Sequence, residues 1–207
     1  MTPQNPRIFL LSPASLSGIR GRALLGGRGS APFWEALRGG GAVPLGEIYA
    51  FISSLYFRGK RTYALRFARP SADTICVWVI TPTRGLVPEH TPTTLADLEE
   101  FAGGAIEPDS QTYLTALRAS ASRLERRLGP GCELILLGSI ASARYLDPLV
   151  EIFGTRLSVP ETFAGRGDMS RGGLLLRCVD AGEELVYVTA AQATRHGARP
   201  PRLARRP

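Results

Sequence analysis

The chain has 207 residues, of which 44% are hydrophobic and 21% are charged, and its 25 basic and 18 acidic residues give a formal net charge of +7 at pH 7. These proportions suit one compact domain and exclude a wholly disordered chain, which would lack the apolar residues that offset the entropy lost on ordering. The longest apolar runs, such as residues 75–80 and 134–137, are far too short to span a bilayer.

The first half of the chain predicts two buried strands separated by loops and helices. Residues Arg7 to Leu11, RIFLL, favour a short strand that Ser12-Pro13 ends, and a long loop rich in glycine and serine follows. Apolar spacing predicts a helix from about Leu45 to Phe57, which Gly59 interrupts. The run ICVWVIT, Ile75 to Thr81, is apolar throughout, as expected of a strand that helices cover on both faces.

The second half continues the alternation of helices and strands. Apolar periodicity with flanking glycines and prolines predicts helices over residues 94–101, 110–128 and about 138–153, and strands over 132–137, 156–159 and 184–189. Thr94 and Asp97 have the spacing of a capping box at the start of the first of these helices. Residues 161–173 favour a polar, glycine-rich loop, and residues 174–179 fit either a helical turn or a strand.

This alternation predicts a single three-layer α/β domain over residues 1–190, with a mostly parallel sheet of about four to six strands flanked by helices. Residues 191–207 predict a basic, flexible tail, because they carry five arginines and no acidic residue. Such a tail is either simply solvated or adds non-specific affinity for nucleic acid through counterion release.

The cysteines and histidines indicate neither disulfides nor a metal site. Cys76, Cys132 and Cys178 each lie in an apolar stretch without CxxC spacing, which fits reduced thiols in a cytoplasmic protein. His90 and His196 are far apart and outside any metal motif, so we predict no metal. No basic segment followed by an apolar one opens the chain, so we expect no signal peptide.

Arginines recur after the predicted strands, where open parallel sheets bind their ligands. Lys60 is the only lysine among the 25 basic residues, and the planar guanidinium of arginine suits phosphate and carboxylate groups. We therefore expect the arginines of these loops to converge on one rim and to hold phosphates. The predicted phosphate ligands are Arg20, Arg84, Arg144, Arg166 and Arg171.

The segment from Gly138 to Ala143 joins a predicted strand to a predicted helix. It is either an anion-binding nest of backbone N–H groups around Ser139 or a tight turn with Ser139 as the helix N-cap. It is neither a Walker motif, since no lysine follows, nor GxGxxG, so we predict no cofactor.

Two acidic residues and two tyrosines are the remaining candidates. Asp168 lies between arginines and could act as a base or ribose ligand, or only as an ion-pair partner. Tyr49 and Tyr56 are seven residues apart on the predicted helix and could stack on bases, or could pack in the core. Glu47 does not share a helix face with Tyr49. With no GxSxG and only two histidines, a Ser-His-Asp triad has little support.

Three pieces of the chain carry a family resemblance. They are Phe9-Leu10-Leu11-Ser12-Pro13-Ala14, then Glu47-Ile48-Tyr49 with Arg61-Thr62-Tyr63-Ala64, then Val79 to Val87, VITPTRGLV, with Leu137-Gly138 and Tyr145 further on. Their order resembles the uncharacterised bacterial families related to the peroxide-stress-resistance protein. Ala14 stands where that group usually has a cysteine, and Ile19 or Arg20 where it has a lysine. The resemblance implies a cytoplasmic α/β protein connected with DNA or nucleobase protection.

Three functions remain open. The leading hypothesis is binding of a nucleic acid or nucleotide at the carboxyl edge of the sheet, where the arginines hold phosphates and Asp168 or Glu47 contacts sugar or base. The alternative is an enzyme that cleaves or transfers at an N-glycosidic bond in a pocket lined by Glu47, Tyr49 and Asp168. The third is an accessory subunit without an active site. No membrane partner is expected, and the oligomeric state is left open.

Overall fold

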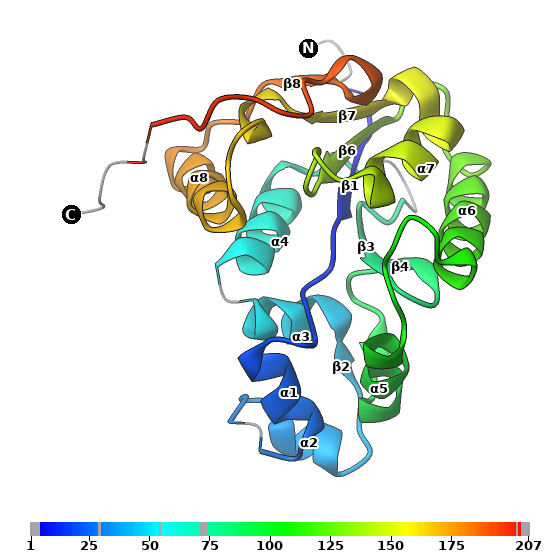
Figure 1. Ribbon diagram of the computed structural model, residues 1–207, viewed down its shortest axis with the longest axis vertical. Helices are drawn as coiled ribbons and strands as arrows, with labels where there is room; N and C mark the ends of the chain where they lie inside the picture. Colours follow the sequence, from blue (N-terminus) through cyan, green and yellow to red (C-terminus); the bar gives the residue numbers. More distant parts are fainter. Residues whose placement is uncertain (1–4, 29, 54, 71–73, 202, 204–207) are drawn as a thin grey trace.

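A six-stranded, mostly parallel sheet runs through the centre of the molecule (Figure 1). The computed structural model describes residues 5–28, 30–53, 55–70, 74–201 and 203. The strands, in spatial order, are β4 (Gly85–Pro88), β3 (Val77–Thr81), β1 (Arg7–Leu11), β6 (Glu133–Leu137), β7 (Leu157–Pro160) and β8 (Tyr187–Thr189). The four inner strands are parallel, and β4 and β8 run antiparallel to their neighbours at the two edges. The predicted α/β architecture is confirmed.

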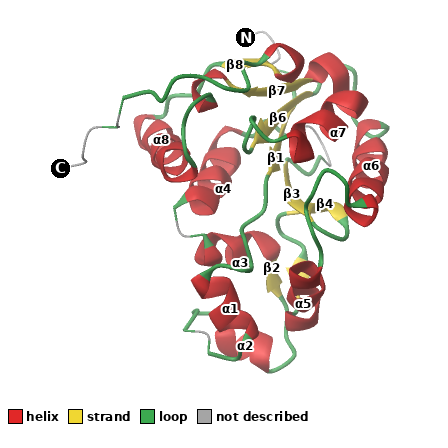
Figure 2. Ribbon diagram, in the orientation of Figure 1, coloured by secondary structure: helices red, strands yellow, loops and turns green. Residues whose placement is uncertain are grey.

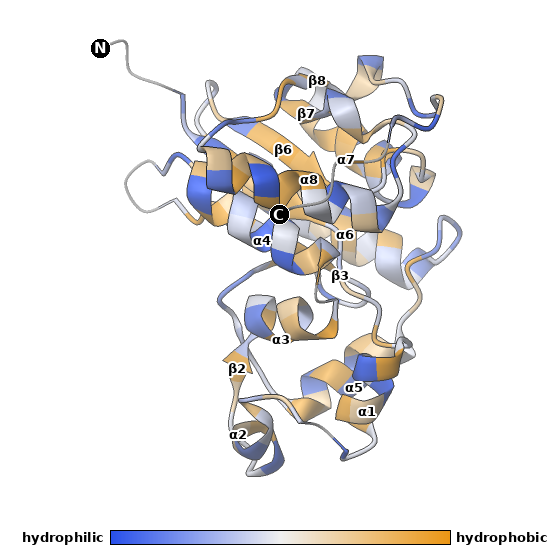
Figure 3. Cartoon of the chain, turned by 90° about the vertical axis from the view of Figure 1, so that its left-hand side faces the viewer, coloured by the Kyte–Doolittle hydropathy of each residue, from blue (hydrophilic) through white to orange (hydrophobic). Residues whose placement is uncertain are grey.

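Helices cover both faces of this sheet and make a three-layer structure. One face carries α4 (Tyr56–Phe67) and α8 (Asp168–Ala181), and the other carries α6 (Gln111–Glu125) and α7 (Ala143–Phe153). Viewed from the side of α8, strands β6 and β7 are coloured mainly as hydrophobic and are seen above α8 and α4 (Figure 3). The side chains of β1 from Ile8 to Leu11 are fully buried, as expected for a strand with helices on both faces.

A second group of elements lies beyond the carboxyl ends of the parallel strands (Figure 2). It is mainly helical and consists of α1 (Ile19–Leu25), α2 (Trp34–Arg38), α3 (Leu45–Ile52), α5 (Leu95–Gly103) and the short pair β2 (Val43–Pro44) and β5 (Pro92–Thr93). We call it the lower lobe. It places residues against the edge of the sheet where ligands of such folds bind.

The helix predicted from Leu45 to Phe57 is wrong, because the chain forms two helices there. The first, α3, ends at Ile52, and Ser53 after it has φ −110° and ψ 74°, outside the helical region. The second, α4, runs uninterrupted through Gly59. A Cβ at Gly59 would lie 2.8 Å from the backbone oxygen of Gly172 in α8. This glycine therefore permits a close contact between the two helices and does not interrupt α4.

One further prediction is wrong in part, and one of the two alternatives for residues 138–143 is excluded. Residues 168–173 belong to α8, which continues unbroken to Ala181, so only the start of the predicted polar loop is irregular. Ser139 is not an N-cap, because α7 begins at Ala143 and its N-cap residue is Ser142. The predicted capping box of Thr94 and Asp97 is confirmed at the start of α5. Helix α1 and strand β4 were not predicted.

Because α4 and α8 pack backbone to backbone, Gly172→Ala is expected to lower the free energy of unfolding by about 1–3 kcal/mol. The new Cβ would lie 2.7 Å from the backbone oxygen of Leu55 and 2.8 Å from the Cα of Tyr56, and neither atom can move freely. Gly173→Ala is the matched control, since its Cβ would meet only the Cδ1 of Leu203, at 3.5 Å. It should leave stability unchanged or raise it by up to about 1 kcal/mol. Equal losses in urea unfolding of both variants would contradict this packing.

Candidate functional site

A polar cavity of about 710 Å³ lies between the carboxyl edge of the sheet and the lower lobe. The chain leaves β1 toward β3 on one side and later enters β6 on the other, so the switch point of the sheet is at the ends of β1 and β6. We call this cavity the sheet-edge pocket. It is lined by residues 12–17, Tyr49, Ser53, Tyr56, Pro82, Phe101, Ala102, residues 104–107, Ser139, Ser142, Arg144, Tyr145 and Asp168.

Ser12 lies at the floor of the sheet-edge pocket, directly after β1. Its backbone N–H continues the sheet by donating to the carbonyl oxygen of Leu137, at 3.2 Å. The ammonium group of Lys60, on α4, donates to the carbonyl oxygen of Ser12 at 2.5 Å and to its Oγ at 2.8 Å. Lys60 thereby ties α4 to the end of the central strand.

Lys60 is completely buried. Its ammonium lies 4.3 Å from the ring centroid of Tyr56 and 5.0 Å from that of Phe57, and within the described residues it forms no salt bridge with a carboxylate. Burial lowers the pKa of Lys60 to about 7, with a smaller opposing effect of Asp168 and a further lowering by Arg171. Part of the Lys60 population is therefore neutral near pH 7.

Tyr56 carries an unpartnered hydroxyl in the same place. The residue is 8% exposed, lines the sheet-edge pocket, and its buried Oη has no hydrogen-bond partner in the described part of the chain. Burial raises the pKa of Tyr56 well above its usual value, and the nearby Arg171 opposes that rise. The group thus stays protonated and available as a donor to a ligand.

Asp168 and Arg171 bring the first turn of α8 to the pocket. Arg171 is buried and donates to the carbonyl oxygen of Phe163 from Nε at 3.3 Å and Nη2 at 3.1 Å. Its Nη1 holds the Asp168 carboxylate at 3.3 Å, while the side chain of Asp168 is 66% exposed. The result is a fixed guanidinium behind a carboxylate that faces solvent.

At the opposite wall, Arg144 and Tyr145 begin α7. The Arg144 Nε donates to the Ser142 Oγ at 2.8 Å and its Nη1 to the carbonyl oxygen of Ile106 at 3.3 Å. Burial raises the pKa of Tyr145, and Arg144 partly offsets the rise. These contacts fix a cation and an aromatic ring on the rim of the pocket.

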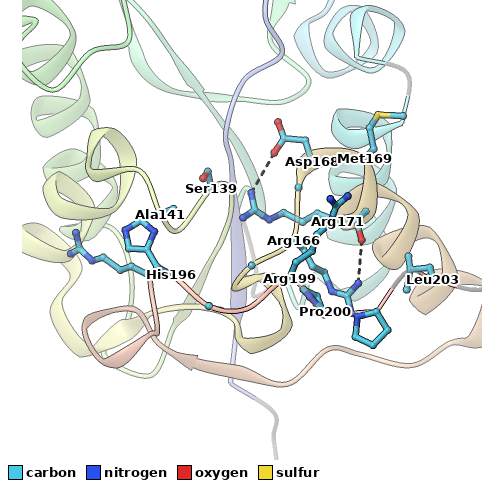
Figure 4. A pocket seen from close by; sticks show the side chains of 16 residues that line it. Ser139, Ala141, Arg166, Asp168, Met169, Arg171, His196, Arg199, Pro200 and Leu203 are labelled. Atoms are coloured by element: carbon cyan, nitrogen blue, oxygen red, sulfur yellow. Dashed lines mark hydrogen bonds and ion pairs between the residues drawn. The ribbon is translucent and has the colours of Figure 1, made fainter.

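A second cavity of about 930 Å³ adjoins the first and shares Ser139 and Asp168 with it. We call it the arginine pocket; its lining also includes Arg166, Arg171, Arg195, His196 and Arg199 (Figure 4). The C-terminal segment forms one wall, since a Cβ at Gly165 (φ +68°) would lie 2.2 Å from the backbone oxygen of Ala198. Arg195 donates to the Asp147 carboxylate at 2.5 Å, which fixes this segment to α7.

Five of the predicted site residues line the sheet-edge pocket, and two more line the arginine pocket. The first group is Tyr49, Tyr56, Ser139, Arg144 and Asp168; the second adds Arg166 and Arg171. Tyr49 and Tyr56 belong to different helices, so they meet at the pocket and not as one helical stripe.

Three predicted site residues lie elsewhere. Arg20, on α1, donates to the carbonyl oxygen of Phe51 at 3.0 Å. Arg84 forms ion pairs with Asp97, at 2.6 Å, and with Glu100. Glu47 is exposed on α3, and none of the three lines either pocket. The predicted arginines therefore do not form one continuous rim. Arg84 is neutralised by carboxylates of α5, and Arg20 is held by α3.

Sequence reasoning did not single out Ser12, Lys60 or Tyr145 as site residues. The one available signal was that the only lysine of the chain follows Tyr56 by four residues, on the same face of a helix. No family model, curated protein or solved structure matches this chain.

Helix length and the grouping of potential metal ligands in the described residues bear on other functions. None of the helices there is long and apolar enough to cross a membrane. No group of three or more His, Cys, Asp or Glu side chains in that part of the chain is arranged to hold a metal ion.

The burial of Lys60 makes stability depend on pH. The pKa of Lys60 is about 7 in the folded state and 10.5 for the free side chain, so between these values the unfolded state binds more protons. The free energy of unfolding of the wild type should therefore rise from about pH 7 to pH 10 relative to that of Lys60→Met. Parallel pH profiles of the two proteins in urea unfolding would show that the lysine titrates normally.

Proposed function

We propose that this protein binds a nucleotide, free or within a nucleic acid strand, with the base in the sheet-edge pocket and phosphate in the arginine pocket. The observation that carries the proposal is the junction of the two cavities at Ser139 and Asp168. One cavity offers hydroxyls and aromatic rings, and the adjoining one offers guanidinium groups. A nucleotide has the same division into an uncharged aromatic part and an anionic part.

The sheet-edge pocket supports the base and sugar half of this proposal. Its volume of about 710 Å³ falls within the range typical of small-molecule sites. Tyr49, Phe101 and Tyr145 supply aromatic surface, and serine hydroxyls from residues 12–17 and Ser142 supply donors and acceptors. Hydrogen bonding by hydroxyls and contact with rings are how proteins recognise unpaired bases.

The arginine pocket supports the phosphate half. Arg166 has only neutral partners among the described residues, the Thr162 carbonyl at 3.0 Å and the Ser170 Oγ at 3.1 Å, so its charge is available to an anion. Arg199 lines the same cavity. The N-terminus of the 14-residue helix α8 adds its dipole at this place. Charge-assisted hydrogen bonds to phosphate are the strong contacts of such a site.

The affinity of the protein for its ligand should depend on the phosphate group. Isothermal titration with a nucleoside, its monophosphate and a short single-stranded oligonucleotide is expected to rank the monophosphate at least about tenfold above the nucleoside, since an added charge-assisted contact contributes about 1.5–3 kcal/mol. The double variant Arg166→Ala, Arg199→Ala should remove that preference. Arg118→Ala, whose side chain pairs with Glu151 at 2.9 Å, is the control and should bind like the wild type.

The oligonucleotide decides between the two forms of the ligand. Affinity that exceeds that of the monophosphate and falls steeply with salt indicates a nucleic acid strand. Equal affinities indicate a free nucleotide. Absence of binding by all three compounds contradicts the proposal.

A second candidate function is cleavage or transfer at an N-glycosidic bond. It is favoured by the position of Asp168, which lines both pockets and therefore faces the sugar of a nucleotide that spans them. A carboxylate there would stabilise the positive charge that develops on the sugar as the base departs. The accessory-subunit alternative has no specific observation in its favour, and the large exposed apolar side chains among the described residues come from different parts of the sequence. They are Ile19, Leu65, Ile75, Met169 and Val186.

If the glycosidic reaction takes place, Asp168→Asn should slow base release at least about 100-fold, because the amide cannot stabilise the cationic transition state. Nucleotide affinity and the midpoint of thermal unfolding should change little, since the carboxylate is largely exposed. Base release is measured by chromatography of nucleotide incubated with each protein. Undiminished release by the variant would exclude Asp168 from the chemistry.

A further inference from the structure

The one lysine of this chain is the most deeply buried cationic residue among those that the structure describes. All other basic residues are arginine, which does not lose its proton in proteins, whereas lysine can. Two arginines are nearly as buried, but each has carboxylate partners: Arg7 pairs with Glu133 at 2.5 Å, and Arg171 pairs with Asp168. Lys60 instead contacts the hydroxyl and carbonyl oxygens of a serine.

We propose that Ser12 is a nucleophile activated by Lys60, and that the sheet-edge pocket carries out acyl transfer on a substrate with an ester or amide bond. The two reacting groups are already in contact, since the Lys60 Nζ lies 2.8 Å from the Ser12 Oγ. A base that hydrogen-bonds directly to a serine hydroxyl is the arrangement that makes serine nucleophilic, and lysine serves as that base in Ser-Lys pairs. The proposal goes beyond nucleotide binding and does not depend on it.

Ser12 borders the pocket but is only 5% exposed, and its Oγ also donates to the carbonyl oxygen of Leu137 at 3.5 Å. Ser12 lines the cavity, whereas Lys60 lies behind it and is not among the lining residues. Gly138, at the end of the neighbouring strand, has no side chain, and a Cβ there would lie 3.2 Å from the Ser12 Cβ and 3.4 Å from its Oγ. Ser12 therefore lies between the pocket, which it lines, and the buried amine of Lys60, which does not line it.

Tyr56 supplies the third component. Tyr56 lines the same pocket, and its buried hydroxyl lies near Arg171 but has no hydrogen-bond partner within the described residues, so its O–H donor is unused. Burying such a group without a partner costs free energy, which a ligand oxygen would recover. In acyl transfer, that oxygen is the one that gains negative charge in the tetrahedral intermediate.

The reaction balances without a further reagent. Neutral Lys60 accepts the hydroxyl proton as the Ser12 Oγ bonds to the acyl carbon, and the carbonyl oxygen becomes an oxyanion that accepts a hydrogen bond from Tyr56. The bond from the acyl carbon to the leaving oxygen or nitrogen breaks, and the Lys60 ammonium returns the proton to the leaving group. Water from the pocket then adds to the acyl carbon of the serine ester and gives its proton to the Ser12 Oγ as that ester bond breaks, which releases the acid and regenerates the free hydroxyl.

The charged groups around Lys60 are compatible with this role. Asp168 and Arg171, both on α8, act on its pKa in opposite directions, and the ring of Tyr56 on its own helix favours the charged form. Burial outweighs these effects and brings the pKa to about 7. The neutral amine that the first step requires is therefore present at neutral pH.

The test is covalent labelling of the full chain with an alkyl fluorophosphonate, followed by intact mass measurement and peptide mapping. The expected result is one adduct on Ser12, absent in Ser12→Ala, whose rate of formation rises with pH through about 7. Lys60→Met and Lys60→Arg should each slow labelling about 100-fold or more, because neither side chain can accept the proton. Tyr56→Phe, which keeps the ring over Lys60, should slow it about tenfold or more.

The controls separate chemistry from folding. Arg58→Met changes an exposed residue of the same helix and should label at the wild-type rate. Circular dichroism establishes that each variant is folded, and if Lys60→Met does not fold, Lys60→Arg and the wild-type pH profile decide. Absence of a Ser12 adduct on the folded wild type between about pH 6 and pH 9, or labelling that is equally fast in a folded Lys60 variant, would overturn the proposal. Nucleotide titration of the same samples reports separately on binding.

Discussion

The structure around the sheet edge depends on the burial of one ammonium group. Removing a cation from water is costly, and the interior must supply oxygen atoms or aromatic faces in return. Lys60 receives them from the carbonyl and hydroxyl of Ser12 and from the ring of Tyr56. These contacts connect helix α4 to the end of β1. They fix the position of Ser12 at the base of the pocket, on the side opposite the lower lobe.

The close contact of α4 with α8 completes the site. Gly59 and Gly172 remove the side chains that would hold the two helices apart, so the first turn of α8 lies near Lys60. Asp168 then lies where the sheet-edge pocket meets the arginine pocket, and Arg171 is fixed behind it by the carbonyl of Phe163. Two cavities of different chemistry therefore meet at one carboxylate, which is the basis of the function proposed for the pair.

Sequence patterns predicted the parts of this structure that are local. The apolar runs of β1, β3 and β6 and the capping box of α5 depend on neighbouring residues, so they could be found without the fold. The start of α8 could not, because Gly172 and Gly173 favour a loop until a second helix packs on them. Lys60 has the same difficulty: between Arg58 and Arg61 it resembles a solvated basic run, and only α8 and the end of β1 bury it. Carboxylates distant in sequence likewise determine which arginines remain available.

Burial leaves Lys60 neutral in part at physiological pH. Since the chain has no other lysine, selective isotope labelling of lysine gives a single side-chain amine, whose titration can be followed by NMR without assignment. The expected midpoint is near pH 7, in agreement with the pKa of about 7 that burial imposes on Lys60. A midpoint at the ordinary value of 10.5 in the folded protein would contradict it.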